Sequence, residues 1–204
     1  VLDDAIADGA IDGTGTITDG TYDMIVLCLH QRIAIQMVQE ALPKIPAGTI
    51  LVDTCGLKGR MVRDLTYRCR KAGVRYVGTH PMAGREKNGY YASIPNLFQN
   101  ANLIVTPVDG TDKAALDTVK ELADQMGFGK IVTATPMWHD NMIAYTSQLA
   151  HVVSSSYVKD FCMDDALSFS GGSFQDMTRV ATMDESMWAA LFLDNRDNLL
   201  YHLD

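Results

Sequence analysis

Three predicted strands of this chain each run into a turn whose residues could do chemistry. The first turn begins at His30, the second holds Gly56 and Lys58, and the third contains His80. In an open α/β sheet such turns lie along the carboxyl edge of the strands, where these folds bind their ligands. The third turn reads THPMAGREKNGYY, so a histidine is followed by a small Ala-Gly step and a basic-acidic-basic run. This combination indicates proton chemistry on an anionic small molecule.

His80 is the first candidate for that proton chemistry. The ordinary pKa of histidine is about 6.5, so its neutral imidazole can accept a proton at physiological pH. The alternative is a histidine that only hydrogen-bonds the end of a strand. The place of His80 beside Pro81 at a strand end favours the functional interpretation. Lys58 is either a source of positive charge or a solvated lysine, and His30 is either a surface histidine or a contact to a cofactor.

The segment HDNMIAYTSQLAH supplies a second group of candidates. Ser147, Gln148 and His151 lie three or four residues apart, so they can share one face of a helix. That face is otherwise apolar, and a polar cluster there needs a partner or a ligand. A hydrogen-bonded core histidine is the alternative for His151. His139 and Asp140 either cap the start of this helix, where a carboxylate suits the helix dipole, or line a site.

Gly171 and Gly172, followed by Ser173 and Arg179, form the best candidate anion site. A helix N-terminus exposes free N–H groups, and an arginine can hold a carboxylate with two parallel hydrogen bonds. The alternative is an ordinary surface arginine in a helix. The sequence therefore predicts one anion site built from the glycine pair and the arginine.

These residues need a scaffold, and strands alternating with helices provide it. Strands are predicted at 23–29, 49–55, 75–81, 102–107 and 129–135, with helices after the first, second and fourth. This alternation favours βαβ units and a mostly parallel, Rossmann-like sheet.

After Pro136 the strand pattern stops. Residues 136–160 predict one long helix, Ser173 predicts an N-cap with Asp176 at the capping-box position, and a last helix is predicted from Asp184 to the end. We therefore expect an incomplete Rossmann-like domain at 1–135 and a helical substrate and dimerisation domain at 136–204. The cleft between two such domains is the expected place for a substrate.

Composition narrows the classes of protein. The chain has 204 residues, 47% hydrophobic and 21% charged, which is ordinary for a globular protein. A net charge of −8 argues against a nucleic-acid partner, which would require a basic face. The four cysteines lie far apart without a C-x-x-C pair, so we expect reduced thiols, a cytoplasmic location and no metal site. No stretch approaches the roughly 20 apolar residues of a membrane span.

The chain begins at Val1, and LDDAIADGAID is typical of the end of a helix. No G-x-G-x-x-G motif occurs, so the dinucleotide fingerprint is missing. We therefore expect that the first βαβ unit is absent and that this chain alone binds a dinucleotide poorly.

Three motifs in order, THPMAGREKNG, HDNMIAYTSQLAH and SGGSFQDMTRVA…MWAALFLDNRDNLL, carry a resemblance to the prephenate/arogenate dehydrogenase family of tyrosine biosynthesis. The similarity runs from about residue 23 to residue 203. It implies an NAD- or NADP-dependent oxidoreductase that converts prephenate to 4-hydroxyphenylpyruvate with loss of CO₂. It also implies a cytoplasmic homodimer formed through the helical domain.

The same resemblance implies roles for individual residues. His80 matches the catalytic base, which would accept the proton of the ring hydroxyl, and Arg179 matches the arginine that binds a substrate carboxylate. His151 matches a histidine near the substrate side chain, to which we assign a catalytic role. Further pocket positions are matched by Glu86, His139, Asp140, Gln148 and Gly172. Along the sheet edge we assign His30, Gly56 and Lys58 to cofactor binding.

The sequence departs from the family pattern at two of these positions. Gly56 stands where a serine usually orients the catalytic histidine, so Thr54 or a water is expected to take that role. Gln148 replaces a histidine, which leaves the choice between prephenate and arogenate open. Two other hypotheses remain: a non-catalytic protein that binds a small carboxylate or a partner, and another two-domain hydroxyacid dehydrogenase.

Overall fold

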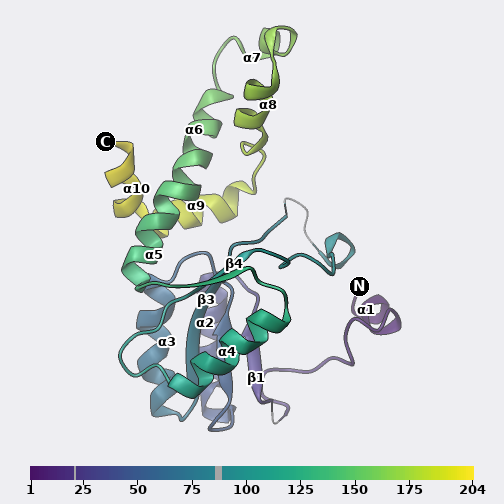
Figure 1. The fold of residues 1–204 in the computed structure, drawn as a ribbon, viewed down its shortest axis with the longest axis vertical. Helices are drawn as coiled ribbons and strands as arrows, with labels where there is room; N and C mark the ends of the chain where they lie inside the picture. Colours follow the sequence, from purple (N-terminus) through teal and green to yellow (C-terminus); the bar gives the residue numbers. More distant parts are fainter. Residues whose placement is uncertain (21, 86–88) are drawn as a thin grey trace. The chain divides into compact units, whose positions relative to one another are not determined.

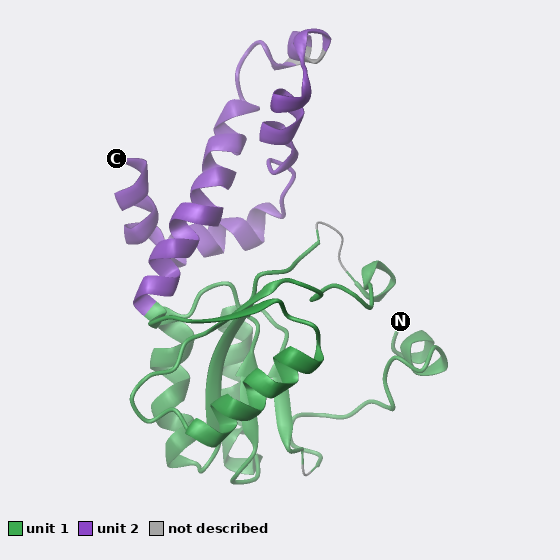
Figure 2. Ribbon diagram, in the orientation of Figure 1, with its two compact units in different colours: residues 1–136 green, residues 137–204 purple. Residues whose placement is uncertain are grey.

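The computed structural model describes residues 1–20, 22–85 and 89–204 (Figure 1). The chain divides into two compact units, Val1–Pro136 and Met137–Asp204 (Figure 2). Each unit has its own set of elements, and each is described by itself below.

The described part of unit 1 is built on a five-stranded sheet whose strands are neighbours in sequence order. Its strands are β1 (Met24–Leu27), β2 (Ile50–Asp53), β3 (Arg75–Pro81), β4 (Asn102–Val105) and β5 (Lys130–Thr133). β1, β2 and β3 are parallel, β4 is antiparallel to β3, and β5 is parallel to β4. The prediction of a mostly parallel, Rossmann-like sheet is therefore confirmed, with each strand within about two residues of its expected position.

The one antiparallel pair follows from the connections. Helices α2 (Gln31–Ala41) and α3 (Gly59–Lys71) join the parallel strands, as a parallel pair requires. Between β3 and β4 the described residues contain only a 3₁₀ turn, Tyr90–Ala92, so no helical crossover is seen there. Helix α4 (Lys113–Gln125) then returns the chain from β4 to β5 in parallel.

Helices cover both faces of this sheet, and the alternation of side chains along the strands divides the core in two. Leu51 and Tyr76 pack with residues of α2 and α3 in one cluster. Val52 and Val77, their neighbours in sequence, pack with residues of α4 in the other. Figure 1 shows α4 in front of the sheet, with α2 and α3 behind it. A short helix α1 (Leu2–Ala7) precedes β1.

Unit 2 is helical, which confirms the predicted fold class of a sheet domain followed by a helical domain. Its helices are α5 (Pro136–Ile143, which begins at the unit boundary), α6 (Leu149–Tyr157), α7 (Met163–Ala166), α8 (Gly172–Arg179), α9 (Glu185–Asp194) and α10 (Arg196–Leu203). A 3₁₀ turn, Leu167–Phe169, follows α7. No helix among the described residues of either unit is long and apolar enough to cross a membrane.

Three local predictions for unit 2 are wrong in detail. The long helix over 136–160 is interrupted by a π-helical segment, Ala144–Gln148. The N-cap of α8 is Gly171, whose extended backbone precedes the helix, so Ser173 lies inside the first turn. The last helix does begin after Asp184, whose side chain accepts a hydrogen bond from the Met187 N–H, but it breaks at Asn195.

Candidate functional site

The carboxyl edge of the parallel strands in unit 1 carries the candidate site residues of this unit. Leu27, Asp53 and Gly78 occupy one row across β1, β2 and β3. His80 lies two residues beyond that row, on the stretch of β3 that pairs with β4 opposite Ile104. The expectation that the three turns share one sheet edge is therefore confirmed.

His80 lies on a definite face of β3. Side chains alternate along a strand, so Tyr76, Gly78 and His80 share one face. A Cβ at Gly78 would lie 3.2 Å from the Val62 Cγ2 of α3, which identifies this as the face covered by α3. His80 itself is partly exposed, at the end of a strand whose middle is buried. An imidazole in this position is anchored by the sheet and can still meet a ligand.

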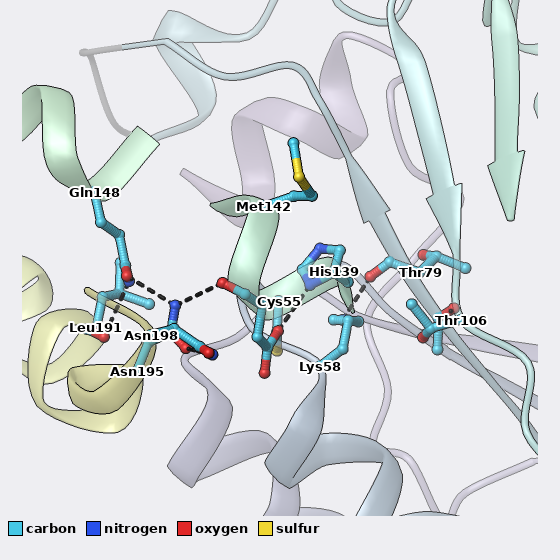
Figure 3. Close-up of polar contacts among 12 residues, drawn as sticks. Cys55, Lys58, Thr79, Thr106, His139, Met142, Gln148, Leu191, Asn195 and Asn198 are labelled. Atoms are coloured by element: carbon cyan, nitrogen blue, oxygen red, sulfur yellow. Dashed lines mark hydrogen bonds and ion pairs between the residues drawn. The ribbon is translucent and has the colours of Figure 1, made fainter. Parts of the chain in front are cut away.

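Lys58, at the N-cap of α3, differs most from its sequence-based interpretation. It is fully buried rather than solvated, and its ammonium group pairs with the Asp53 carboxylate. The same ammonium group donates a hydrogen bond of 2.5 Å to the carbonyl oxygen of Thr79 (Figure 3). Lys58 is therefore directed into the protein interior, beneath the strand that carries His80.

Asp53 is a residue that the sequence analysis missed. Its Oδ2 accepts a hydrogen bond of 2.7 Å from the Tyr76 hydroxyl, and its Oδ1 accepts one of 2.9 Å from the Cys55 N–H. Burial, reinforced by this carboxylate, raises the pKa of the Tyr76 hydroxyl well above its ordinary value. The same two causes raise the pKa of the Cys55 thiol to about 12. A signal was present in the sequence, because a carboxylate that ends an apolar strand needs a partner when it is buried.

The residues assigned to cofactor binding differ in what they can offer. His30 is exposed at the N-cap of α2, and Gly56 is partly exposed in the turn after β2. Both lie along the edge where α/β sheets bind dinucleotides, and they fit such a ligand. Lys58 does not, because its ammonium group is buried and paired with Asp53. The glycine-rich turn that would receive a pyrophosphate is not among the residues of this sequence.

In unit 2, His139 and Asp140 form a buried pair on α5. The His139 Nδ1 lies 2.7 Å from the Asp140 Oδ1, and both side chains are buried. The helix begins at Pro136, three residues before His139, so neither residue is its N-cap. A carboxylate bound to one ring nitrogen fixes the orientation of the imidazole.

Gln148 ends the π-helical segment and is buried in a hydrogen-bonded network (Figure 3). Its Nε2 donates to the Leu191 carbonyl over 3.1 Å, and its Oε1 accepts from the Asn195 Nδ2 over 2.8 Å. The same Asn195 amide donates to the Asp140 carbonyl over 2.8 Å. The π-helical segment therefore has a tertiary cause, since Gln148 is held against the junction of α9 and α10. Such segments are frequent at functional sites.

His151 is held by two contacts within unit 2. Its Nδ1 lies 2.9 Å from the Val180 carbonyl oxygen, which can only accept, so Nδ1 carries a proton. Its ring lies against Trp188, with ring centroids 3.6 Å apart. Burial lowers the pKa of His151, while the hydrogen bond that its Nδ1 donates to the Val180 carbonyl opposes that shift. The result is an imidazole whose Nε2 is the nitrogen left to accept a proton when the ring is neutral.

Arg179 and Gly172 lie at opposite ends of α8. This helix has eight residues, so Gly172 and Arg179 are seven positions and about 10 Å apart along its axis. Arg179 is exposed in the last turn, next to the Val180 carbonyl that binds His151. A Cβ added at Gly172 would meet open space.

The structure thus brings predicted residues together within each unit. In unit 1 the buried Lys58 lies under the strand that bears His80. In unit 2 His151 contacts the residue after Arg179, and Gln148 joins the network that includes Asp140. Glu86 lies outside the described residues. No group of three metal-binding side chains occurs among the residues that the structure describes.

Two family models match consecutive parts of the chain. The model of the prephenate dehydrogenase nucleotide-binding domain matches residues 4–133, and that of the prephenate dehydrogenase dimerization domain matches residues 135–204. The chain belongs to the prephenate dehydrogenase family. The family resemblance expected from the three sequence motifs is confirmed.

Individual relatives agree with this family assignment. The chain is 30% identical to prephenate dehydrogenase of Bacillus subtilis, over 100% of the chain and 54% of that protein. It is 32% identical to cyclohexadienyl dehydrogenase of Zymomonas mobilis, over 89% of the chain and 63% of that protein. The chain therefore spans about half to two thirds of the length of these curated relatives.

A solved structure in the same family has the same fold. Prephenate dehydrogenase from A. aeolicus, in complex with hydroxyphenyl propionate and NAD+, superposes with a TM-score of 0.83 and is 29% identical. The comparison covers 99% of this chain and 72% of that one.

Proposed function

We propose that the protein catalyses the oxidative decarboxylation of prephenate to 4-hydroxyphenylpyruvate, with NAD or NADP as hydride acceptor. The observation that carries this proposal is the position of His80 at the carboxyl end of β3, in a chain that both prephenate dehydrogenase models match in order. The A. aeolicus relative, whose structure holds NAD+ and a hydroxyphenyl ligand, supports the same substrate class.

Besides the hydride acceptor, this reaction requires a general base and a group that binds a substrate carboxylate. Nicotinamide, when bound, accepts the hydride that leaves C4 of the ring. His80 takes the proton of the C4 hydroxyl as that oxygen becomes a carbonyl, and a neutral imidazole is suited to this transfer. Loss of CO₂ from C1 is driven by aromatisation, so the protein contributes positioning and charge matching. His30 and Gly56 would contact the cofactor along the sheet edge.

Arg179 is the proposed receptor for a substrate carboxylate. It is exposed, and a guanidinium group can bind a carboxylate with two parallel hydrogen bonds. In a chain of net charge −8, a dianionic substrate requires such a localised cation. Gly172, about 10 Å away along α8, would contact a different part of the ligand.

The remaining pocket residues take supporting roles in this proposal. His151 keeps the catalytic assignment through its Nε2, the nitrogen that the Val180 contact leaves available. His139, Asp140 and Gln148 are buried, so they would shape the pocket from within the helical unit. Glu86 is proposed as a further substrate contact from its sequence motif. A cytoplasmic location remains a prediction from the cysteine pattern.

A homodimer through the helical unit is part of the same proposal. Few apolar side chains of unit 2 are buried among the described residues: Ile143, Ala144 and Leu199. Large apolar side chains such as Leu193 and Tyr201 are instead exposed by 69% and 74%. A helical unit with so little core of its own is typical of a subunit interface. The match of residues 135–204 to a dimerization domain supports the same conclusion.

The proposal is tested by following reduced nicotinamide formation with the full-length protein. Prephenate and arogenate are offered separately, each with NAD and with NADP. Turnover of prephenate in preference to arogenate is the expected result. Preference for arogenate would support the alternative substrate, and a protein that binds dinucleotide and either compound without turnover would support the non-catalytic hypothesis. Turnover of an unrelated hydroxyacid alone would favour the remaining alternative.

A further inference from the structure

A buried ion pair contacts the residue that precedes the proposed catalytic histidine. Lys58 and Asp53 are both fully buried, and their charged groups are in direct contact. A buried ion pair gives little net stability, because desolvation of both charges offsets their attraction, and a well-packed apolar pair often stabilises a fold as well. The pair therefore calls for an explanation other than stability.

What Lys58 contacts besides Asp53 suggests that explanation. Its ammonium group donates to the carbonyl oxygen of Thr79, and that carbonyl belongs to the peptide group that joins Thr79 to His80. The Thr79 hydroxyl in turn donates a hydrogen bond of 2.5 Å to the Asp53 carbonyl. Thr79 is thus held through both its backbone and its side chain, immediately before the imidazole.

The charged pair is itself fixed to the scaffold. The Tyr76 hydroxyl and the Cys55 N–H bind the two oxygens of Asp53, so its carboxylate cannot rotate without breaking buried hydrogen bonds. Lys58 stands at the N-cap of α3, which packs on the same face of β3 as His80. The network therefore joins β2, α3 and β3 at one point of the sheet edge.

We propose that Lys58 and Asp53 are positioning residues that fix the peptide plane and hence the ring orientation of His80. This inference rests on the proposed function, in which His80 is the base. Gly56 occupies the place of the serine that usually orients the catalytic histidine, so another group has to take that role. In this proposal the Lys58–Asp53 pair takes it. Thr54, one of the two alternatives considered, directs its hydroxyl to the Leu27 carbonyl over 3.3 Å.

The test compares five variants of the full-length protein by steady-state kinetics over a range of pH. Asp53→Asn with Lys58→Met removes both buried charges together, so neither is left unpaired. Thr106→Val is the matched control, because its hydroxyl also holds a β3 carbonyl, that of Gly78, over 3.2 Å, two residues from His80. His80→Asn is made alone and in combination with the double variant. Thr79→Val, a milder change at the same anchor, serves if the double variant does not fold.

The double variant is expected to lower kcat by about 100-fold with little change in KM, because a small misplacement of a reacting group has an effect of that size. The acid limb of its kcat profile, which reports the protonation of His80 in the complex, should shift. Added to His80→Asn, the double variant should cause no further loss. Thr79→Val should show the same shift with a smaller loss of kcat, and Thr106→Val should keep the wild-type profile.

Two failures are distinguishable. Suppose that His80→Asn is inactive. If the double variant then behaves like Thr106→Val, or if the effect of the double variant adds fully to that of His80→Asn, the positioning inference is wrong and the proposed function stands. If His80→Asn retains wild-type turnover and an unchanged acid limb, the proposed function itself is wrong, and the inference falls with it.

Discussion

Single residues in this protein differ in how well their roles could be predicted from the sequence. His80 could be singled out because a strand, a proline and a glycine surround it. The role of Lys58 could not be predicted, because a lysine beside a turn is usually solvated. In the structure its ammonium group instead contacts the Asp53 carboxylate and the Thr79 carbonyl. No local signal in the sequence indicated the role of the Asn195 Nδ2, since the two oxygens to which it donates lie 47 and 55 residues away in the chain.

Arg179 gives a direct prediction at this scale. Arg179→Ala should raise KM for the substrate by about 10- to 100-fold with a smaller change in kcat, because a hydrogen-bonded charge is worth about 1.5–3 kcal/mol. Arg179→Lys keeps the charge without the two-pronged geometry and should give an intermediate KM. An unchanged KM in Arg179→Ala, measured by initial rates, would show that another cation binds the carboxylate.

His151 predicts a pH dependence of stability. Burial lowers its pKa below the ordinary value of 6.5, so the unfolded chain takes up the proton more readily than the folded protein. Its effect is absent above that value, and stability is lost as pH falls below about 6.5. Urea unfolding at about pH 7.5 and about pH 5.5 should show a smaller loss for His151→Gln than for the wild type. His30→Gln is the control and should lose as much stability as the wild type. A reduced loss in His30→Gln as well, or an equal loss in the wild type and both variants, would contradict the assignment of this pH dependence to His151.

At the scale of elements, periodicity located the strands and helices of unit 1 well, because apolar residues recur there at the spacing each element requires. The antiparallel β4 was not predicted, although the absence of a helical pattern between 82 and 101 could have indicated it. The π-helical segment and the break at Asn195 depend on the Gln148 network, which joins residues distant in sequence. Local pattern carries no information about such contacts.

Gly78 tests how tightly β3 is packed next to the site. A Cβ at this position would lie 2.7 Å from the Thr106 Oγ1 and 3.2 Å from the Tyr76 hydroxyl. Gly78→Ala should therefore destabilise the protein by about 1–3 kcal/mol, the usual effect of overpacking. Chemical denaturation would measure the loss, and Thr106→Ala in the same chain should restore part of it. Full stability of Gly78→Ala alone would mean that β3 can move away from β4.

At the scale of the whole molecule, the two units differ in how they are stabilised. Unit 1 has two apolar clusters on the two faces of its sheet. Unit 2 leaves many large apolar side chains exposed, so we expect a second copy of the chain to cover them.

Substitutions on the helical unit test this expectation. Leu193→Glu combined with Tyr201→Glu should lower the mass measured by light scattering from that of a dimer to that of a monomer, because buried unpaired charges oppose association. Tyr67→Glu, at a tyrosine of unit 1 that is 70% exposed, is the matched control and should leave the mass unchanged. A dimer that survives the double substitution would place the interface elsewhere.

The central claim is that the imidazole at position 80 accepts the proton of the substrate hydroxyl. The most direct measurement is turnover of prephenate by His80→Asn in the full-length protein, with substrate binding measured separately by calorimetry. Asparagine has a similar size but cannot take up a proton near neutral pH, so kcat should fall by about 100- to 10,000-fold, the usual contribution of a general base, while binding persists. Wild-type turnover by His80→Asn would contradict the account.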